Sequence, residues 1–416
     1  MSNRALIIAF HFPPQAGSSG IQRTLSFSKH LGNLGWQPLV LSAQPIAYGE
    51  KNPSQLKSVP ASLTVRRAFS LDAKRHLGLF GRYPELLALP DRWMSWWFFA
   101  VPVGLSLIRR HKPAVIWSTF PIATSHLIGL TLHRLTGIPW VADFRDPMLQ
   151  PAHPSSRWQR NIYAWIEKQT ITHCRKAIFT TQSALNAYRV RFPALPRDKF
   201  VVIENGYDEE GFAGMGVIAA ASLTCEKPVT LLHSGVLYAE GRNPSAFFEA
   251  ISKLKADGRA SHASLSVILR ATGDDARFIE LTKKHGVDDI VRIEPPVPYR
   301  QALQEMLEVD GLLVFQGTQF NTQVPAKIYE YFRASKPILG LIDPAGETAR
   351  ILTAAGFRDM APMNSADRIA ATLGEFLENV RTGKAYVAGH EVIEAASRQR
   401  RTGELARVFS EVCSKT

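Results

Sequence analysis

Short apolar runs of strand length alternate with helical patterns along most of this chain, and no other feature restricts its fold as strongly. Between the runs, apolar residues recur at the three- and four-residue spacing of a helix. Repeated strand-then-helix order predicts parallel sheets covered by helices on both faces. In the first half the strand-like runs are residues 4–10, 39–41, 114–117, 140–142, 177–180 and 201–203, and the helical patterns are 122–135, 158–172 and 183–190.

The alternation stops at the Asn205-Gly206 turn and restarts at residue 229. Residues 207–228 are small and weakly patterned, so we predict a linker there. The later strand-like runs are residues 229–232, 265–269, 290–293, 311–315 and 337–342. We therefore expect an α/β fold with two Rossmann-like, doubly wound parallel-sheet domains, residues 1–206 and 229–389, whose strand ends face a shared cleft.

The segment 324–340 combines a short charged helix with a buried strand. Lys327 and Glu330 lie one helical turn apart in it, close to where the helix begins. A helix N-terminus offers unpaired N–H groups to phosphate oxygens, with Lys327 beside them. Glu330 can accept hydrogen bonds from a ribose diol. The alternative interpretation is a solvated pair of opposite charges on an ordinary surface helix.

A glycine-rich turn joins the first predicted strand to the first predicted helix. Its residues are Gly17, Ser18, Ser19 and Gly20. Backbone amides can approach a phosphate there without interference from Cβ atoms. The turn matches neither the GxGxxG dinucleotide fingerprint nor the GxxxxGK[ST] P-loop. The alternative interpretation is a tight connection without a ligand.

Polar residues also follow the first strand of the second predicted domain. Ser234 and Gly235 come directly after that strand, and Arg242 opens the next helix. An arginine at this point can bind a diphosphate through two parallel hydrogen bonds. The alternative is that Arg242 is a plain surface residue.

The net charge of +13 is concentrated in the first half of the chain. Residues 1–206 hold 25 Lys and Arg against 9 Asp and Glu, whereas residues 207–416 hold 24 against 27. A basic half predicts an anionic partner, which can be a phosphorylated substrate, an anionic membrane face or nucleic acid. We expect no nucleic acid partner, since the sequence has no helix-turn-helix, zinc-finger or RNP pattern.

Residues 92–112 place apolar and aromatic side chains between basic ends. Sixteen residues separate Arg92 from Arg109, fewer than a helix needs to span a bilayer. Two interpretations stay open. In one, the Trp96-Trp97-Phe98 cluster lies among lipid headgroups and the segment makes peripheral contact with an anionic membrane. In the other, the segment is a buried core helix.

The cysteines and the N-terminus predict a cytoplasmic location, including the inner face of the membrane. Cys174, Cys225 and Cys413 are far apart and in no metal-ligand spacing, which excludes a zinc motif and a disulfide framework. The chain enters its first strand-like run at Arg4 without a secretory leader pattern.

With these segments in order, the chain resembles the retaining, GT-B-fold glycosyltransferases of family 4, which use a nucleotide-activated sugar. The resemblance extends over nearly the whole sequence. The matching segments are Phe12-Pro13-Pro14 through Gln22-Arg23, residues 140–147 (WVADFRDP), residues 204–208 (ENGYD), His233-Ser234-Gly235, Arg242-Asn243-Pro244 and residues 325–331 (PAKIYEY).

This resemblance implies roles for both domains. The N-terminal domain would bind the acceptor and the C-terminal domain the nucleotide sugar, with Glu330 on the donor ribose and Arg242 on the diphosphate. The 17–20 loop would approach the donor phosphates, and the last helix, within residues 390–416, would cross back onto the N-terminal domain. The implied reaction moves a hexose-type sugar to a lipid-linked or polysaccharide acceptor in cell-envelope glycan synthesis, such as that of lipopolysaccharide, and needs no cofactor.

The charged residues indicate how such a transfer is catalysed. The sequence has no Asp-x-Asp pair, so we expect metal-independent stabilisation of the leaving diphosphate by Arg242 and Lys327. Asp143 or Asp146 would position or deprotonate the acceptor hydroxyl, although Asp146 is equally suited to cap a helix. Arg145 is the candidate for an acceptor phosphate.

Two departures from the family pattern favour a different function. Thr322 stands where the family usually has an acid, and Val236 where it often has a second basic residue. A nucleotide-sugar-binding protein of GT-B fold without transferase activity is therefore the alternative. A GT-B-fold epimerase is a third option, for which the sequence offers no acid/base pair of carboxylates.

Overall fold

The structure is a computed structural model that describes residues 3–17, 20–78, 88–150, 153–216, 227–238 and 240–414. The chain forms two compact units. The first unit comprises Met1–Asn205 with Arg398–Thr416, and the second comprises Gly206–Ser397.

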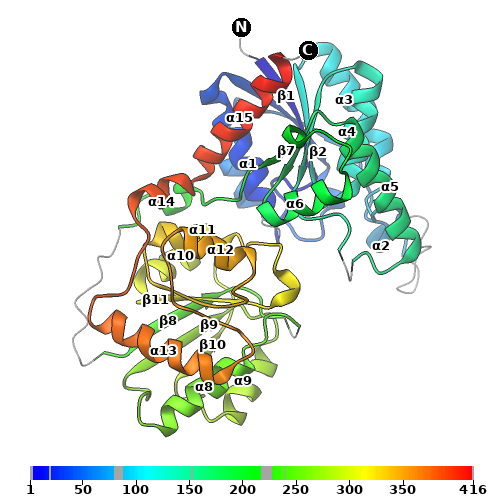
Figure 1. The fold of residues 1–416 in the computed structure, drawn as a ribbon. Coiled ribbons are helices and arrows are strands. Elements are labelled where there is room, and N and C mark those ends of the chain that lie inside the picture. The colour runs from blue at the N-terminus through cyan, green and yellow to red at the C-terminus, as the bar shows by residue number, and fades with distance from the viewer. Residues whose placement is uncertain are drawn as a thin grey trace. The chain divides into compact units, whose positions relative to one another are not determined.

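The first unit is built on a seven-stranded parallel sheet (Figure 1). Its order is β3-β2-β1-β4-β5-β6-β7, so the direction of winding reverses between β1 and β4. The inner strands β4, β5 and β6 are buried along their whole length, as expected for a sheet covered on both faces, whereas β3 and β7 at the two sheet edges are only partly buried. They are β1 (Asn3–Ile8), β2 (Trp36–Ala43), β3 (Thr64–Ala68), β4 (Val115–Phe120), β5 (Trp140–Phe144), β6 (Lys176–Phe179) and β7 (Phe200–Val202).

Helices cover the two faces of this sheet (Figure 1). Leu6 and Ile8 of β1 pack into the cluster that α3 to α6 cover, whereas Ala5 and Ile7 pack into the cluster of α1 and α15. This alternation follows from the two-residue repeat of a strand. The helices are α1 (Gly20–His30), α2 (Ala73–His76), α3 (Ser95–His111), α4 (Ala123–Thr136), α5 (Arg157–His173), α6 (Gln182–Arg191) and α15 (Arg398–Ser414).

The C-terminal helix α15 is part of the first unit's core. Phe409 is fully buried and its ring meets the Trp36 ring edge-on at 5.3 Å. Arg401 of the same helix pairs with Glu204 at 2.6 Å. Burying one such aromatic side chain contributes about 1.5–3 kcal/mol, so the last residues of the chain stabilise the first unit.

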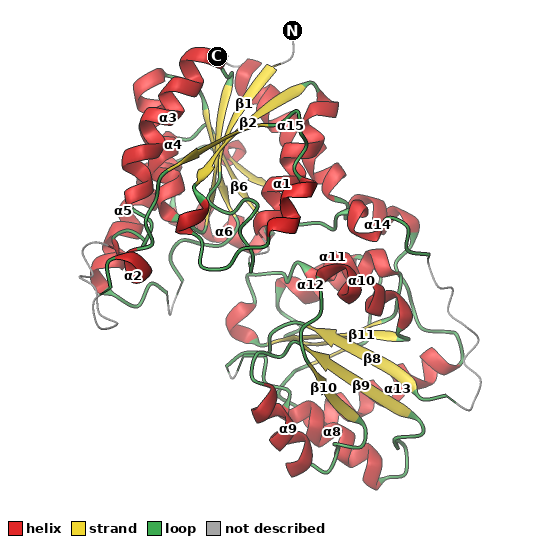
Figure 2. Cartoon of the chain, turned by 180° about the vertical axis from the view of Figure 1, so that it is seen from behind, coloured by secondary structure: helices red, strands yellow, loops and turns green. Residues whose placement is uncertain are grey.

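The second unit is built on a six-stranded parallel sheet in the order β10-β9-β8-β11-β12-β13 (Figure 2). The winding reverses between β8 and β11. The strands are β8 (Val229–Ser234), β9 (Leu265–Arg270), β10 (Val291–Glu294), β11 (Gly311–Gln316), β12 (Ile338–Ile342) and β13 (Met360–Ala361). The helices are α7 (Glu209–Phe212), α8 (Ser245–Ala256), α9 (Asp275–Lys284), α10 (Tyr299–Glu308), α11 (Lys327–Ala334), α12 (Glu347–Ala354), α13 (Ala366–Arg381) and α14 (His390–Ala395).

The predicted linker 207–228 is corrected in its first part. Tyr207 and Phe212 are buried in the core of the second unit, beside Leu303 of α10. Arg333 holds this segment through an ion pair with Glu209 at 2.6 Å. Two aromatic side chains hidden in a weakly patterned stretch explain why the segment resembled a linker. Residues 217–226 lie outside the described part of the chain.

The two parallel sheets confirm the predicted α/β class and the two Rossmann-like domains. In sheets of this kind, ligands bind beyond the carboxyl ends of the strands where the winding reverses. This rule selects the β1/β4 edge in the first unit and the β8/β11 edge in the second. Among the described helices, none combines the length and the apolar composition that crossing a bilayer requires.

Candidate functional site

At the β8/β11 edge of the second unit, a glycine loop lies under a lysine. Strand β8 ends at Ser234, and Gly235 follows with φ of +133°, a conformation that side chains rarely allow. A Cβ atom on Gly235 would come within 2.7 Å of the Lys327 Nζ. Glycine is therefore required both for the turn and for the close approach of the lysine.

Lys327 is the first residue of α11, and its ammonium is held against the end of β8. The Nζ donates to the Ser234 carbonyl oxygen at 2.6 Å and lies 3.4 Å from the His233 Nε2. His233 donates from Nδ1 to the Leu313 carbonyl at 3.0 Å, so its Nε2 accepts from the lysine. Burial lowers the pKa of Lys327 to about 7, and the nearby positive charge of Arg242 contributes. Burial and the lysine together lower the pKa of His233 well below its usual value.

Arg242 is fixed by two aromatic rings. Its guanidinium lies 5.1 Å from the ring centre of Tyr238 and 5.5 Å from that of Phe320. The Nη1 makes only a long contact of 3.4 Å with the Val236 carbonyl, and within the described part of the chain no hydrogen-bond partner lies near the Nε. Burial lowers the pKa of Arg242. Arg242 and Lys327 are thus two desolvated cations that lie near enough for the charge of Arg242 to lower the pKa of Lys327. An anion bound between them would stabilise both charges.

Glu330 follows one turn after Lys327 on α11 and is partly exposed. Its Oε1 accepts a hydrogen bond of 2.7 Å from the hydroxyl of Tyr299, at the start of α10. The carboxylate also raises the pKa of Lys327, which opposes the effect of burial. The second unit therefore brings together five predicted donor-site residues: Ser234, Gly235, Arg242, Lys327 and Glu330.

In the first unit, Asp143, the last residue but one of β5, forms a fully buried ion pair. Arg23 of α1 binds it through two hydrogen bonds of 2.8 and 3.2 Å, and Thr119 donates to it at 2.9 Å. Arg23 also donates to the carbonyl oxygens of Ile203 and Glu204. With both carboxylate oxygens engaged and no exposed surface, Asp143 is placed to fix the β4 and β5 strand ends rather than to take a proton from a substrate.

Arg145 lies over Gly20 at the start of α1, and Asp146 follows Arg145 in the chain. The Arg145 guanidinium packs so tightly over Gly20 that a Cβ atom there would overlap its Nη1. The Nη1 also lies 3.3 Å from the His11 Nδ1, and burial, with a smaller effect from the charge of Arg145, lowers the pKa of His11 to about 3. Burial raises the pKa of Asp146 and Arg145 opposes that change. Asp146 thus has the more suitable environment for proton transfer of the two predicted aspartates.

Of the other residues in the predicted 17–20 loop, the structure describes only Gly17. Gly17 has φ of +78°, and Ser18 and Ser19 lie outside the described part of the chain. The chain also has two pairs of adjacent aspartates, Asp274-Asp275 and Asp288-Asp289. One member of each pair has a local partner, since Asp275 accepts a hydrogen bond from Thr272 and Asp289 pairs with Lys255. Among the described residues, no group of three or more His, Cys, Asp or Glu side chains is arranged to hold a metal ion.

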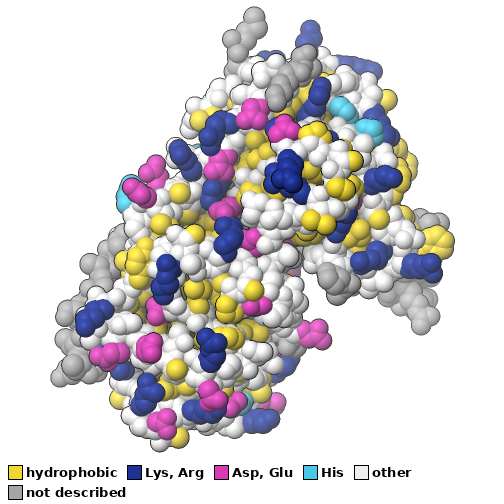
Figure 3. All heavy atoms as spheres, viewed as in Figure 1, with side chains coloured by type: hydrophobic (Ala, Val, Ile, Leu, Met, Phe, Trp, Pro, Cys, Tyr) yellow, Lys and Arg dark blue, Asp and Glu magenta, His cyan; other side chains and the backbone are white. Residues whose placement is uncertain are grey.

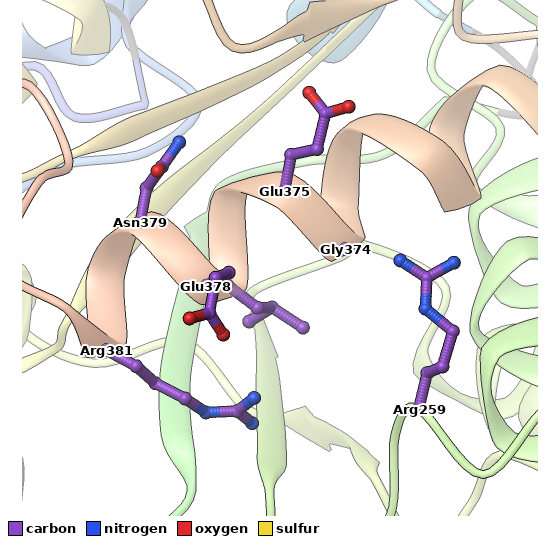
Figure 4. Close-up of a pocket in the computed structure, with 7 residues that line it drawn as sticks. Arg259, Gly374, Glu375, Glu378, Asn379 and Arg381 are labelled. Carbon is purple, nitrogen blue, oxygen red and sulfur yellow. The ribbon is translucent and has the colours of Figure 1, made fainter.

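The groove in Figure 4 does not belong to this site. It has a volume of about 630 Å³ and lies between α13 and the loop that precedes β9, at the amino-terminal edge of the second sheet. Arg259 and Arg381 reach it from the loop and from the helix end, beside Glu378. The candidate donor residues are at the opposite, carboxyl edge of that sheet.

Sequence reasoning missed several residues that shape the two edges. Arg23 was part of a matching segment without a role, and its partner is 120 residues away. Tyr238, Phe320 and Tyr299 carried no motif. A signal existed for Tyr238 and Phe320, because each lies in a loop that follows a strand of the second sheet.

The comparisons with known proteins agree with this geometry. Residues 19–206 match the glycosyl transferase 4-like domain. This match confirms the resemblance to family 4 glycosyltransferases over that segment. No curated protein matches the sequence.

Solved structures with the same fold cover essentially the whole chain. They include the lipopolysaccharide outer core galactosyltransferase WaaB (12% identity, 98% of this chain and 99% of that chain, TM-score 0.62). Another is WaaG, a glycosyltransferase involved in lipopolysaccharide biosynthesis (13%, 97% and 99%, 0.60). A third is sucrose-phosphate synthase from Thermosynechococcus elongatus (13%, 100% of both chains, 0.62). At such identities the likeness establishes the GT-B fold.

Proposed function

We propose that this chain, which carries a glycosyl transferase 4-like domain on a GT-B fold, is a glycosyltransferase that uses a nucleoside diphosphate sugar. The observation that carries the proposal is the β8/β11 edge. There, Arg242 lies against two aromatic rings and the Lys327 ammonium against a carbonyl oxygen, neither cation forms a salt bridge with a described residue, and Glu330 follows one turn later. A diphosphate supplies the missing negative charge, and the ribose hydroxyls of the same nucleotide suit the carboxylate.

In the proposed reaction, the bond between the sugar C1 and the diphosphate oxygen breaks, and a bond from C1 to an acceptor oxygen forms. Arg242 and Lys327 stabilise the charge that grows on the leaving diphosphate. By the resemblance, the role of contacting the donor phosphates is also assigned to residues 17–20 of the first unit. Asp146 takes or orients the proton of the acceptor hydroxyl, and Arg145 binds a phosphate of the acceptor. Asp143 of β5 links this strand to β4 through Thr119 and to α1 through Arg23.

The resemblance to family 4 glycosyltransferases also suggests the type of sugar, the stereochemistry and the acceptor. We propose a hexose-type sugar, retention at C1, no catalytic metal, and a lipid-linked or polysaccharide acceptor of the cell envelope. Two of the structural neighbours are named as lipopolysaccharide glycosyltransferases. We propose that the enzyme acts at the cytoplasmic face of the membrane, where such acceptors are used.

The alternative proposal is a nucleotide-sugar-binding protein without transfer. It is favoured by Thr322 and Val236, which are both exposed and uncharged where family members usually carry charge. The two proposals share the donor site and differ in turnover.

One experiment separates them. Nucleoside diphosphate sugars are first screened by thermal shift, since a bound donor raises the melting temperature. Transfer or hydrolysis of the sugar is then measured for wild type and Glu330→Ala, with Glu375→Ala, an exposed change on α13, as the control. Turnover lost in Glu330→Ala alone supports the transferase, and binding without turnover in wild type supports the alternative. Full turnover in Glu330→Ala removes the site.

A further inference from the structure

The outer face of helices α3, α4 and α5 carries an unusual set of exposed aromatic side chains. Helix α4 lies between the other two, joined to α3 by the hydrogen bond from the Trp97 Nε1 to Thr131 (3.0 Å) and to α5 by that from Arg134 to Gln169 (2.7 Å). Figures 1 and 2 show the three helices side by side on one face of the sheet. We call this the α3–α5 face.

Every exposed tryptophan and phenylalanine among the described residues belongs to this face. Trp158 is 72% exposed and Trp165 is 51% exposed, both on α5, seven residues and two turns apart. Phe98 and Phe99 of α3 are 60% and 47% exposed. Exposed apolar residues scattered singly are normal on proteins, but large aromatic side chains gathered on two helices of one layer indicate a contact surface.

The structure also divides the Trp96-Trp97-Phe98 cluster. Trp96 is fully buried and Trp97 packs against the core, so these two belong to the core-helix interpretation. Phe98 and Phe99 are exposed instead, and the Phe99 ring also meets the Phe69 ring edge-on at 5.0 Å. The lipid-facing interpretation therefore moves from Trp96 and Trp97 to Trp158 and Trp165.

The charge around these aromatics is of one sign. Residues 88–175 contain four acids, of which Asp91, Asp143 and Glu167 are buried, and Asp146 belongs to the acceptor-side cluster. No described carboxylate of this segment is therefore exposed on the α3–α5 face. The exposed cations in the same segment are Arg109, Arg110, Lys112, Arg134, Arg157, Lys168 and Arg175. On the side where Figure 1 draws these helices, the coloured side chains of the space-filling view include dark blue basic, yellow hydrophobic and cyan histidine side chains (Figure 3).

We propose that the α3–α5 face is a docking surface for an anionic lipid bilayer. Tryptophan and phenylalanine side chains insert at the headgroup level, while lysine and arginine attract anionic lipids. The aromatic residues lie on two helices with α4 between them, an extended arrangement that fits a planar surface better than a single peptide anchor. The proposed contact is peripheral, because the helices that carry these side chains pack with their other faces on the core of the first unit. This inference does not rest on the proposed function, because vesicle binding requires neither donor nor transfer.

The test is sedimentation of the full chain with vesicles. Vesicles of phosphatidylcholine with about 30% phosphatidylglycerol are compared with pure phosphatidylcholine vesicles. Wild type is expected to bind the anionic vesicles. The double variant Trp158→Ser/Trp165→Ser is expected to bind about tenfold less, because it loses apolar area that enters the bilayer. Arg157→Ala/Lys168→Ala is expected to bind about 30-fold less, the effect of two basic residues at about 1 kcal/mol each.

Matched controls carry equivalent changes elsewhere. Val190→Ser removes an apolar side chain that is 81% exposed on α6, and Lys283→Ala/Lys284→Ala removes two exposed cations on α9. Both controls are expected to bind as wild type, and melting curves show which variants keep the fold. Equal binding of the tryptophan variant and Val190→Ser overturns the proposal, as does absence of wild-type binding to either vesicle. Binding of a single-stranded RNA that the α3–α5 changes abolish, with vesicle binding unaffected, overturns it in favour of nucleic acid.

Discussion

The pH dependence of donor use should reveal Lys327 of the proposed donor site. Because the pKa of Lys327 is lowered to about 7, the ammonium is present below that pH and is lost as the pH rises through it. Only the charged form attracts a diphosphate. We therefore expect kcat/KM for the nucleotide sugar to be constant below about pH 7 and to fall above it.

The size of the fall follows from the titration. One pH unit above the pKa, about a tenth of the molecules carry the charge, so kcat/KM should fall about tenfold for each further unit, or 1.36 kcal/mol. A bound diphosphate stabilises the ammonium and raises the pKa of Lys327 in the complex. The corresponding fall in kcat should therefore begin at a higher pH than the fall in kcat/KM.

Three variants test whether Lys327 is the group whose titration lowers kcat/KM above about pH 7, which we call the alkaline limb of the pH profile. Lys327→Arg keeps its charge at all these pH values, so the limb near pH 7 should disappear. Lys327→Met should have low, pH-independent activity. Arg242→Gln removes a positive charge that lowers the pKa of Lys327, so the limb should move to higher pH although the KM for the donor rises.

The assay is initial-rate kinetics with the best donor from the thermal-shift screen, from about pH 5.5 to about pH 9 at constant ionic strength. Binding of the nucleoside diphosphate by calorimetry at the same pH values separates affinity from chemistry. If Lys327→Arg keeps the wild-type limb near pH 7, another group titrates there and the reasoning fails.

Three further predictions concern the supports of the two sites. Asp143→Asn should cost about 3–5 kcal/mol of stability, because it leaves the Arg23 charge buried and uncompensated; a loss below 1 kcal/mol in urea unfolding would contradict the buried pair. Gly235→Ala should lower the melting temperature, because φ of +133° disfavours a side chain, and should also raise the donor KM, since its Cβ would displace the Lys327 ammonium; an unchanged KM would speak against that contact. Phe409→Ala should destabilise the chain by about 3–5 kcal/mol, and unaltered thermal unfolding would show that α15 adds nothing to the first unit.

Much of the fold could be read from the sequence because buried parallel strands are continuous apolar runs. Residues 265–269 and 311–315, for example, coincide with β9 and β11 to within one residue. Strand β3 was missed since it lies at a sheet edge, is only partly buried and contains Arg66 and Arg67. Strand β13 has two residues, too few for any pattern.

The part of the candidate site whose residues are close together in the sequence could be predicted from the sequence. Lys327 and Glu330 lie on one short helix, and Gly235 and Arg242 follow one strand, so chain order alone brought them to the same sheet edge. The pairing of Arg23 with Asp143 was not predictable, because it joins distant segments through the tertiary fold. Spacing alone likewise cannot tell a buried Trp96 from an exposed Phe98, since neighbouring helix residues face different directions.

The most direct test is a crystal structure of the chain with a bound nucleoside diphosphate. The account predicts diphosphate oxygens within hydrogen-bonding distance of the Lys327 Nζ and the Arg242 guanidinium, and a ribose hydroxyl on the Glu330 carboxylate. A nucleotide bound at another edge of the sheet, or one whose phosphates touch neither cation, would contradict it.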